Sequence, residues 1–422
     1  MPSRRVLLAG AAGLVAGGGL VADRVRLGEV DDWTPTADTW PLSRYDLANT
    51  AAVPDVSVPD DPTVDWTASV AASSQFAPQA LVVDTDRVYA GADGLVALDR
   101  GGGSKVWSDE RPVDTLARRG GRLFVAGGDG ESPRVAARDA ATGDTAWTRD
   151  LPALPAGLTV AAGMVLTTTR FGSVAREQDT GIRRWGGESP DLRAQPLVHD
   201  GALFGHDGYE LVRYRPRSAL DVPLRAVPPA EWRSVTQVER IDAPVGAGSR
   251  VLVPGTRYGF RTDAGAPAFR AVDATTGEVA WRAIRSDERD AFLGSRYAAV
   301  DAARDRVYAG VYRQWTSEPT TGERFRATVR AFALEDGAVA WTHEAGTGRF
   351  VRDVVFAGDR VLVATARDED ATDGAPGDVR ALDPIDGRER WRVAFDAPAR
   401  TLAPVDGTVF AMAGNGLVAA LR

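Results

Sequence analysis

Two of the three histidines in this chain stand where metal ligands would suit. His199 and His206 flank a short strand-like run, and an aspartate follows each of them. A zinc site needs three or four converging ligands, so this pair alone falls short. We therefore interpret the two histidines as polar residues at the ends of a strand and predict no metal site.

Other chemistry is limited by what the sequence lacks. The chain has no cysteine, which excludes disulfides, thiolate metal sites and cysteine nucleophiles. It has no Gly-x-Ser-x-Gly, no His-Glu-x-x-His and no phosphate-binding glycine loop. The acidic run from Arg367 to Gly374 does not follow the ligand order of a calcium loop, so we interpret it as a solvated loop.

The composition is close to that of an ordinary globular chain and excludes several function classes. Apolar residues make up 44% and charged residues 26%, which excludes a wholly disordered or multi-span membrane protein. The net charge of −8 argues against nucleic-acid binding, which needs a basic field. The 45 glycines and 25 prolines favour many short strands joined by tight turns.

The N-terminus resembles a twin-arginine export signal. Arg4 and Arg5 precede an uncharged, glycine-rich stretch that lasts through Ala22. We predict a signal segment at 1–22 and a linker rich in Pro, Asp and Thr at 23–63. The predicted location is extracytoplasmic, either secreted or tethered to the outer side of the cytoplasmic membrane. Cleavage is left open, and an uncleaved signal would be the only membrane contact.

A repeat runs through the rest of the chain. The phrase Asp-x-x-Thr-Gly-x-x-x-Trp fits Asp139 to Trp147 and Asp273 to Trp281, and variants of it end at Trp107, Trp185, Trp341 and Trp391. Each copy follows runs in which apolar residues alternate, which indicates antiparallel strands. Thr-Gly between two such runs is typical of a hairpin turn.

The spacing of the tryptophans predicts the architecture. Successive markers lie about 46 residues apart on average, which is one four-stranded propeller blade. The markers are Trp66, Trp107, Trp147, Trp185, Trp232, Trp281, Trp341 and Trp391. The last repeat ends without its tryptophan strand, and Trp66 lies in a strand without a blade. We predict an all-β, eight-bladed propeller closed by the N-terminal strand, with seven blades as the alternative if Trp232 is misassigned.

The repeats in 64–422 resemble those of the pyrroloquinoline-quinone-type (PQQ-like) propeller family. That family includes quinoprotein alcohol dehydrogenases and BamB, a lipoprotein of outer-membrane assembly. The resemblance implies that the tryptophans dock between blades. It also implies that an enzyme would hold its quinone with a cysteine pair, a stacking tryptophan and calcium.

The missing cysteines and the shorter chain favour the non-catalytic, BamB-like branch. We therefore predict no cofactor and a protein or other macromolecular partner at the cell surface. Some sugar-oxidising relatives lack the cysteine pair, so a dehydrogenase of alcohols or sugars that uses PQQ and calcium is the alternative. A sensor of a small ligand is a third.

A candidate partner surface lies in long links between the second and third strands of three successive blades, predicted at Arg257 to Gly265, Tyr312 to Arg326 and Arg367 to Gly377. These links all emerge on one face of a propeller, and two of them carry aromatic residues among arginines, which favours a binding surface. The alternative is that these rings pack under their own loops. The residues are Arg257, Tyr258, Phe260, Arg261, Tyr312, Arg313, Trp315, Arg324 and Phe325.

Overall fold

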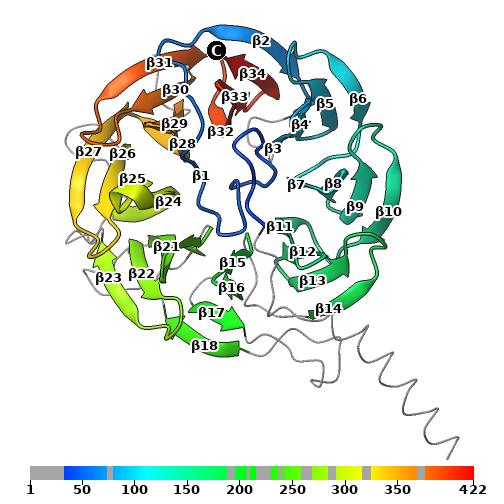
Figure 1. Ribbon diagram of the computed structural model, residues 1–422, viewed down its shortest axis with the longest axis horizontal. Helices are drawn as coiled ribbons and strands as arrows, with labels where there is room; N and C mark the ends of the chain where they lie inside the picture. The colour runs from blue at the N-terminus through cyan, green and yellow to red at the C-terminus, as the bar shows by residue number, and fades with distance from the viewer. Residues whose placement is uncertain are drawn as a thin grey trace, which may run out of the picture.

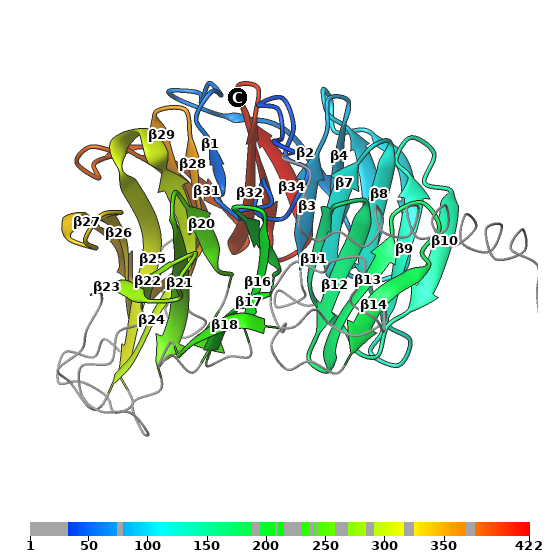
Figure 2. The ribbon, with the colours of Figure 1, turned by 60° about the horizontal axis from the view of Figure 1, so that its bottom comes forward.

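Four-stranded antiparallel sheets follow one another around a closed ring in the computed structural model (Figure 1). The structure describes residues 33–73, 79–187, 195–206, 210–214, 230–235, 240–241, 243–257, 269–283, 291–315, 325–367 and 376–422. In each blade the first strand lies nearest the axis and the fourth at the rim (Figure 1), and Figure 2 shows the blades side by side in a second view. Among the described residues, no helix is long and apolar enough to cross a membrane.

Blades 1 to 4 take the chain halfway around the ring. Blade 1 consists of β3 (Ala80–Val83), β4 (Arg87–Gly91), β5 (Leu95–Asp99) and β6 (Lys105–Asp109). Blade 2 consists of β7 (Thr115–Arg119), β8 (Arg122–Gly127), β9 (Arg134–Asp139) and β10 (Thr145–Asp150). Blade 3 consists of β11 (Pro155–Ala161), β12 (Met164–Thr169), β13 (Gly172–Glu177) and β14 (Arg183–Gly187). Blade 4 consists of β15 (Leu197–His199), β16 (Ala202–His206), β17 (Glu210–Tyr214) and β18 (Ala230–Val235).

Blades 5 to 8 complete it. Blade 5 consists of β20 (Val245–Ala247), β21 (Arg250–Arg257), β22 (Phe269–Asp273) and β23 (Val279–Ala283), with β19 (Arg240–Ile241) beside β21. Blade 6 consists of β24 (Ala291–Asp301), β25 (Arg306–Trp315), β26 (Phe325–Ala333) and β27 (Val339–Thr347). Blade 7 consists of β28 (Arg349–Ala357), β29 (Arg360–Arg367), β30 (Gly377–Leu382) and β31 (Glu389–Phe395). Blade 8 combines β32 (Ala399–Val405), β33 (Thr408–Ala413) and β34 (Leu417–Leu421) with β2 (Val64–Ser69).

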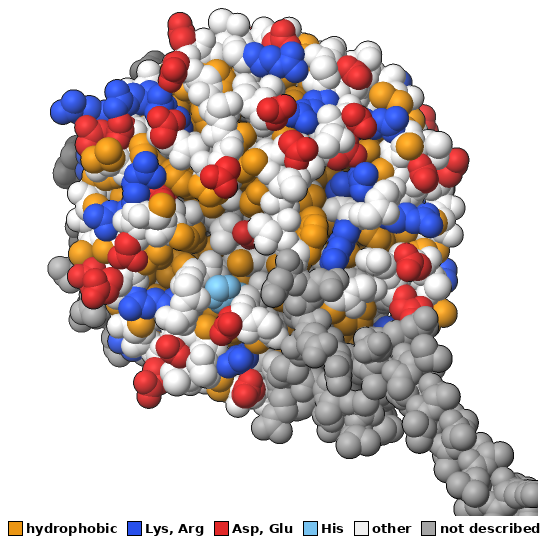
Figure 3. All heavy atoms as spheres, viewed as in Figure 1, with side chains coloured by type: hydrophobic (Ala, Val, Ile, Leu, Met, Phe, Trp, Pro, Cys, Tyr) orange, Lys and Arg blue, Asp and Glu red, His pale blue; other side chains and the backbone are white. Residues whose placement is uncertain are grey.

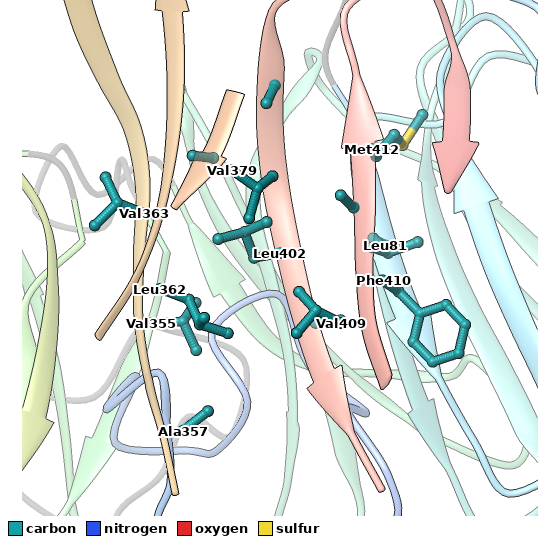
Figure 4. Close-up of a cluster of buried hydrophobic side chains, with 14 of the residues drawn as sticks. Leu81, Val355, Ala357, Leu362, Val363, Val379, Leu402, Val409, Phe410 and Met412 are labelled. Atoms are coloured by element: carbon teal, nitrogen blue, oxygen red, sulfur yellow. The ribbon is translucent and has the colours of Figure 1, made fainter. Parts of the chain in front are cut away.

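The two ends of the chain close the ring, as predicted. Strand β2 pairs antiparallel with β34, with Thr67 opposite Ala419. The prediction of eight blades is confirmed, and Trp232 lies in β18 of blade 4. Figure 4 shows how side chains of blade 8, among them Leu402 and Val409, pack between those of blades 7 and 1. Burial of this apolar surface, together with pairing of the edge strands, holds the ring shut.

Tryptophans of the outer strands contact the turn of the following blade. The ring of Trp107 lies so close to Gly143 that a Cβ there would come within 2.8 Å of it, and Gly143 has a φ of 81°. The indole Nε1 of Trp107 donates to the carbonyl of Ala140 at 3.2 Å. The same approach joins Trp66 to Gly103, Trp147 to Gly181, Trp232 to Gly277, Trp281 to Gly337 and Trp341 to Gly387. Glycine is therefore required here both for its positive φ and for its missing side chain.

Two of the tryptophans precede blades that lack this turn. Trp185 precedes blade 4, which has no Thr-Gly in its sequence, and Trp391 precedes blade 8, which is divided between the chain ends. Both indole Nε1 atoms are buried without a hydrogen-bond partner. Their rings thus contribute burial without this hydrogen bond, and the same is true of Trp232, whose Nε1 is buried without a partner although its ring contacts Gly277.

Blades 5 and 6 are joined into one nine-stranded sheet. Strand β21 pairs with β24 as well as with its own blade, with Arg257 opposite Leu293. The sequence predicts a link from Tyr312 to Arg326, but β25 extends through Trp315 and β26 begins at Phe325. The extended ends of β25 and β26 therefore occupy part of the link that the sequence predicts.

Candidate functional site: an axial pocket closed by the N-terminal segment

Residues 33–58, here called the plug, cross the centre of the ring on the face seen in Figure 1. They belong to the segment that the sequence predicts as a linker. Trp40 forms an antiparallel bridge with Val83 of blade 1, and Leu42 forms one with Ala117 of blade 2. Farther along, β1 (Ala52–Val53) pairs in parallel with β28 of blade 7. The plug therefore uses the inner strands of the blades as hydrogen-bond partners.

The plug also bridges blades 4, 5 and 6. The carbonyls of Leu47, Ala48 and Thr50 accept hydrogen bonds from Val198, Gly246 and Val300, respectively. The buried amide of Asn49 donates to the carbonyls of Pro196 and Pro244, both at 3.1 Å. Figure 3 shows the same face, where hydrophobic side chains gather around the centre.

The plug holds three residues other than glycine in the left-handed region. Tyr45, Asn49 and Ala51 have φ values of 73°, 55° and 47°. Such conformations cost about 1 to 3 kcal/mol each and persist where surrounding contacts fix them. The hydrogen bonds to six blades supply those contacts, so the path of the plug is set by the ring.

A buried ion pair ties the plug to blade 7. The guanidinium of Arg44 contacts the carboxylate of Asp353, and both side chains are more than nine-tenths buried. A second nitrogen of Arg44 donates to the carbonyls of Ala298 at 2.6 Å and Val354 at 3.1 Å. Asp353 accepts a further hydrogen bond from the Leu402 amide at 3.0 Å. The ion pair and these further hydrogen bonds satisfy both charged groups, which offsets the cost of removing them from water.

A pocket of about 330 Å³ lies on the other side of this ion pair, where inner strands begin. It lies toward the face that carries the links between second and third strands. The plug contributes Ser43 and Arg44 to it. The other lining residues are Gln79, Ala80, Leu81, Asp114, Thr115, Tyr297, Arg352, Asp353, Arg400 and Thr401. We call this space the axial pocket.

Three residues of the axial pocket sit at bulges in the inner strands of successive blades. Tyr297 in β24, Arg352 in β28 and Arg400 in β32 are each skipped in the pairing with the second strand. Tyr297 also has a φ of 52°. A bulge re-aims a side chain out of the sheet pattern and is frequent beside functional sites. Blades 6, 7 and 8 thus use one device to bring a long polar side chain to the axis.

Three arginines and two carboxyl groups line the pocket, so its side chains carry a net positive charge. Burial, and then the neighbouring Arg352, lowers the pKa of Arg400. Asp353 is already matched by Arg44. Burial and the charge of Asp93 raise the pKa of Asp114 to about 6, and its Oδ2 is buried without a hydrogen-bond partner. The pocket therefore suits an anionic group, and suits it better when Asp114 is protonated.

The predicted partner residues fall partly within the described structure. Arg257, Arg313, Trp315 and Phe325 lie on strands of the joined sheet, where Phe325 pairs with Gln314 beside Trp315. Tyr312 is half-buried and packs against the main core. Tyr258, Phe260, Arg261 and Arg324 lie outside the described residues.

The two histidines of blade 4 lie where the strand interpretation places them. His199 ends β15, and its Nε2 is 2.7 Å from the carbonyl oxygen of Gly248 in blade 5. His206 ends β16 and is buried. Within the described ranges, no three His, Asp or Glu side chains converge in a way that suits a metal ion.

Sequence reasoning missed the axial residues. Arg44 lies in the predicted linker, and neither Arg352 nor Arg400 belongs to a repeat phrase. A bulge leaves no reliable mark in a sequence, because it is defined by pairing between strands. The only available signal was the order Trp40 to Asp46 ahead of the first blade, which resembles the segment that often stands there in the family.

The described lining does not fit a quinone held with calcium. Calcium takes six to eight oxygen ligands, mostly carboxylates and carbonyls. The lining offers two carboxylates, and one of them, Asp353, is committed to Arg44. No tryptophan is among the lining residues that could stack on a quinone. The donor set is that of an anion site and not of a calcium centre.

The fold and the pocket define an eight-bladed β-propeller with a plugged axis. The family model described as outer membrane protein assembly factor BamB matches residues 131–219 and 326–422. These two matched segments, together with the fold, support a PQQ-like β-propeller repeat family. No curated protein matches the sequence.

Solved structures share the fold at low identity. BamB from Moraxella catarrhalis is 16% identical, with a TM-score of 0.58 over 86% of this chain and 97% of that one. The quinohemoprotein alcohol dehydrogenase ADHIIG from Pseudomonas putida is 14% identical, with a TM-score of 0.61 over 95% and 81%. A europium-containing methanol dehydrogenase is 12% identical, with a TM-score of 0.63 over 92% and 98%. At these identities the likeness establishes the fold alone.

Proposed function

We propose that this chain is an extracytoplasmic, non-catalytic binding propeller that holds a protein partner by an acidic group placed in the axial pocket. The observation that carries the proposal is the pair of bulges that bring Arg352 and Arg400 into the pocket beside the neutralised Arg44–Asp353 pair. The similarity to a model described as an assembly factor supports a binding role. The signal-like segment with Arg4 and Arg5 supports the location.

The chemistry of the pocket favours a carboxylate as the bound group. Arginine presents several N–H donors in a planar fork that matches the two oxygens of a carboxylate. The plug fills one end of the ring axis, so the group enters from the opposite face of the ring. We propose that the partner also contacts the joined sheet of blades 5 and 6 and the predicted links beside it. The residues of this surface are Arg257, Tyr258, Phe260, Arg261, Tyr312, Arg313, Trp315, Arg324 and Phe325.

Calorimetry with a defined acidic probe tests the pocket. An amidated hexaglutamate peptide should bind the intact chain, and the R352A/R400A variant should bind it at least tenfold more weakly, because each charged hydrogen bond contributes about 1.5 to 3 kcal/mol. R388A is the matched control, since Arg388 is 82% exposed and lies in a turn on the plug face. Equal affinity of all three proteins for the peptide would refute the proposal.

A quinoprotein dehydrogenase is the second candidate, because solved enzymes of that kind share the fold. It predicts dye reduction with alcohols or sugars after the purified chain is incubated with PQQ and calcium. We expect no such activity above that of the R352A/R400A variant. Turnover that requires both PQQ and an intact pocket would favour the enzyme over the binding propeller.

A further inference from the structure

Among the described residues, the buried Arg270 is a cation without a counter-charge. It lies in β22 of blade 5 and is 1% exposed. One terminal nitrogen donates to the carbonyl of Val235 in blade 4 at 3.0 Å, while Nε and the other terminal nitrogen have no partner. Burial, and then the neighbouring Arg282, lowers the pKa of Arg270 to about 10. A buried guanidinium is expected to be paired, because an unmatched charge in the interior costs several kcal/mol.

Arg282 adds a second positive charge at the same place. The two arginines are directly opposite each other in the pairing of β22 with β23, so their side chains lie on one face of the sheet. Arg282 is exposed, which leaves this pair a side open to solvent. Throughout the described residues, no acidic side chain forms an ion pair with either of them. The pair therefore concentrates positive charge at the junction of blades 4 and 5.

Blade 7 contains the same arginine pair with acidic partners. Arg380 and Arg392 occupy the matching positions of β30 and β31 and are also directly opposite. Arg380 donates from Nε to Asp378 at 2.6 Å and from a terminal nitrogen at 2.9 Å. Glu389 accepts from Arg392 at 2.6 Å and lies 3.8 Å from Arg380. Arg380 and Arg392 thus each have an acidic partner, and Asp378 also pairs with Arg349 of the same blade at 2.9 Å.

The repeat identifies what blade 5 lacks. The position of Glu389, opposite Leu382, corresponds to Val279, opposite Val272. The position of Asp378, two residues before Arg380, corresponds in the sequence to Ala268. Both acids are therefore replaced by small apolar residues while both arginines are kept. Blade 5 thus keeps both arginines without the two acids, which favours binding of an anion from solution.

We propose that Arg270 and Arg282 bind a small inorganic anion, such as chloride, between blades 4 and 5. The ion takes the place that carboxylates take in blade 7 and accepts hydrogen bonds from the free N–H groups of Arg270. Its binding stabilises the folded ring, because unfolding separates the strands that carry the two arginines. The site is independent of the axial pocket and stands whether or not that pocket binds a partner.

Thermal unfolding at constant ionic strength tests the site. Replacing sodium gluconate with sodium chloride should raise the Tm of the full chain by a few degrees, and the rise should saturate. V279E restores the acid of blade 7, so it should raise the Tm in gluconate and lose most of the response to chloride. R270M should lose the response as well, whereas R392M in blade 7 should keep it.

The source of the anion is distinguished by the salts used. A response to chloride and bromide but not sulfate assigns a halide, and the reverse assigns an oxyanion. Crystals grown in bromide should show an anomalous peak beside the Arg270 guanidinium. The proposal is overturned if V279E keeps the full response of the natural chain to every one of these anions, an outcome that can be read even if R270M does not fold.

Discussion

Arg44 and Asp353 are 309 residues apart in the chain and form a buried ion pair beneath the axial pocket. One belongs to the plug and the other to the inner strand of blade 7. Each has further hydrogen bonds, so neither charge depends on the other alone. The pair makes the plug part of the core of the ring and supplies one wall of the pocket.

Removing one partner of this pair should destabilise the chain strongly. D353A leaves Arg44 buried without its carboxylate, and we expect a loss of about 3 to 5 kcal/mol in the free energy of unfolding. Urea denaturation followed by tryptophan fluorescence measures it. The R44M/D353L variant, which removes both charges, should recover a large part of the loss. A single variant as stable as the natural chain would contradict the role given to the pair.

The protonation of Asp114 should set the pH dependence of the pocket. Its folded pKa of about 6 lies above its ordinary value, so folding favours the protonated form. The stabilising contribution is present at low pH and is lost as pH rises through 6. D114N should therefore stabilise the chain at pH 8 by about 1 to 2 kcal/mol, allowing for solvent screening, and change it little at pH 4.

The same group should control affinity for an acidic probe. Binding of the hexaglutamate peptide should weaken between pH 5 and pH 7 as Asp114 becomes negative and repels it. D114N should bind with an affinity that no longer changes over this range, apart from the titration of the peptide itself. A hexaglutamine peptide of matched length separates the effect of charge from that of burial. An unchanged pH profile in D114N would assign the titration to another group.

The glycine of the repeat turn should tolerate no side chain. In G143A the Cβ would meet the ring of Trp107 at 2.8 Å while the backbone keeps a φ of 81°. We expect a loss of about 2 to 4 kcal/mol, from strain and from the displaced ring together. Gly120 is the matched control, because its φ is 54° and nothing lies within 4 Å of the place that a Cβ would take. G120A should lose only about 1 kcal/mol.

Strand β2 and the plug should have separable roles. A chain that begins at Val64 lacks the plug but keeps β2, so we expect a closed ring of lower stability. A chain that begins at Val70 also lacks β2 and leaves the edge of β34 unpaired. Unpaired edges recruit other strands, so this shorter chain should associate. Size-exclusion chromatography with light scattering distinguishes the two, and equal masses per particle would contradict this division.

The repeat was predictable because its signals are local. A turn such as Thr142-Gly143 and a tryptophan such as Trp147 are read within nine residues, and strand alternation is read within five or six. Closure by the strand around Trp66 followed from a missing fourth strand at the C-terminus. The joining of blades 5 and 6 through Arg257 and Leu293 was not predicted, since it depends on how far two strands extend beyond their own blades.

The sequence by itself thus determined the class of fold, the number of blades and the manner of closure, because spacing along a chain reports the period of a repeat. Only the tertiary structure decided where Arg44, Arg352 and Arg400 meet. Their meeting place depends on bulges in separate blades and on a plug that crosses the ring. It also decided that Arg270 is buried without the acids that serve Arg380. Charge balance in an interior is set by neighbours in space, which the order of residues along the chain does not reveal.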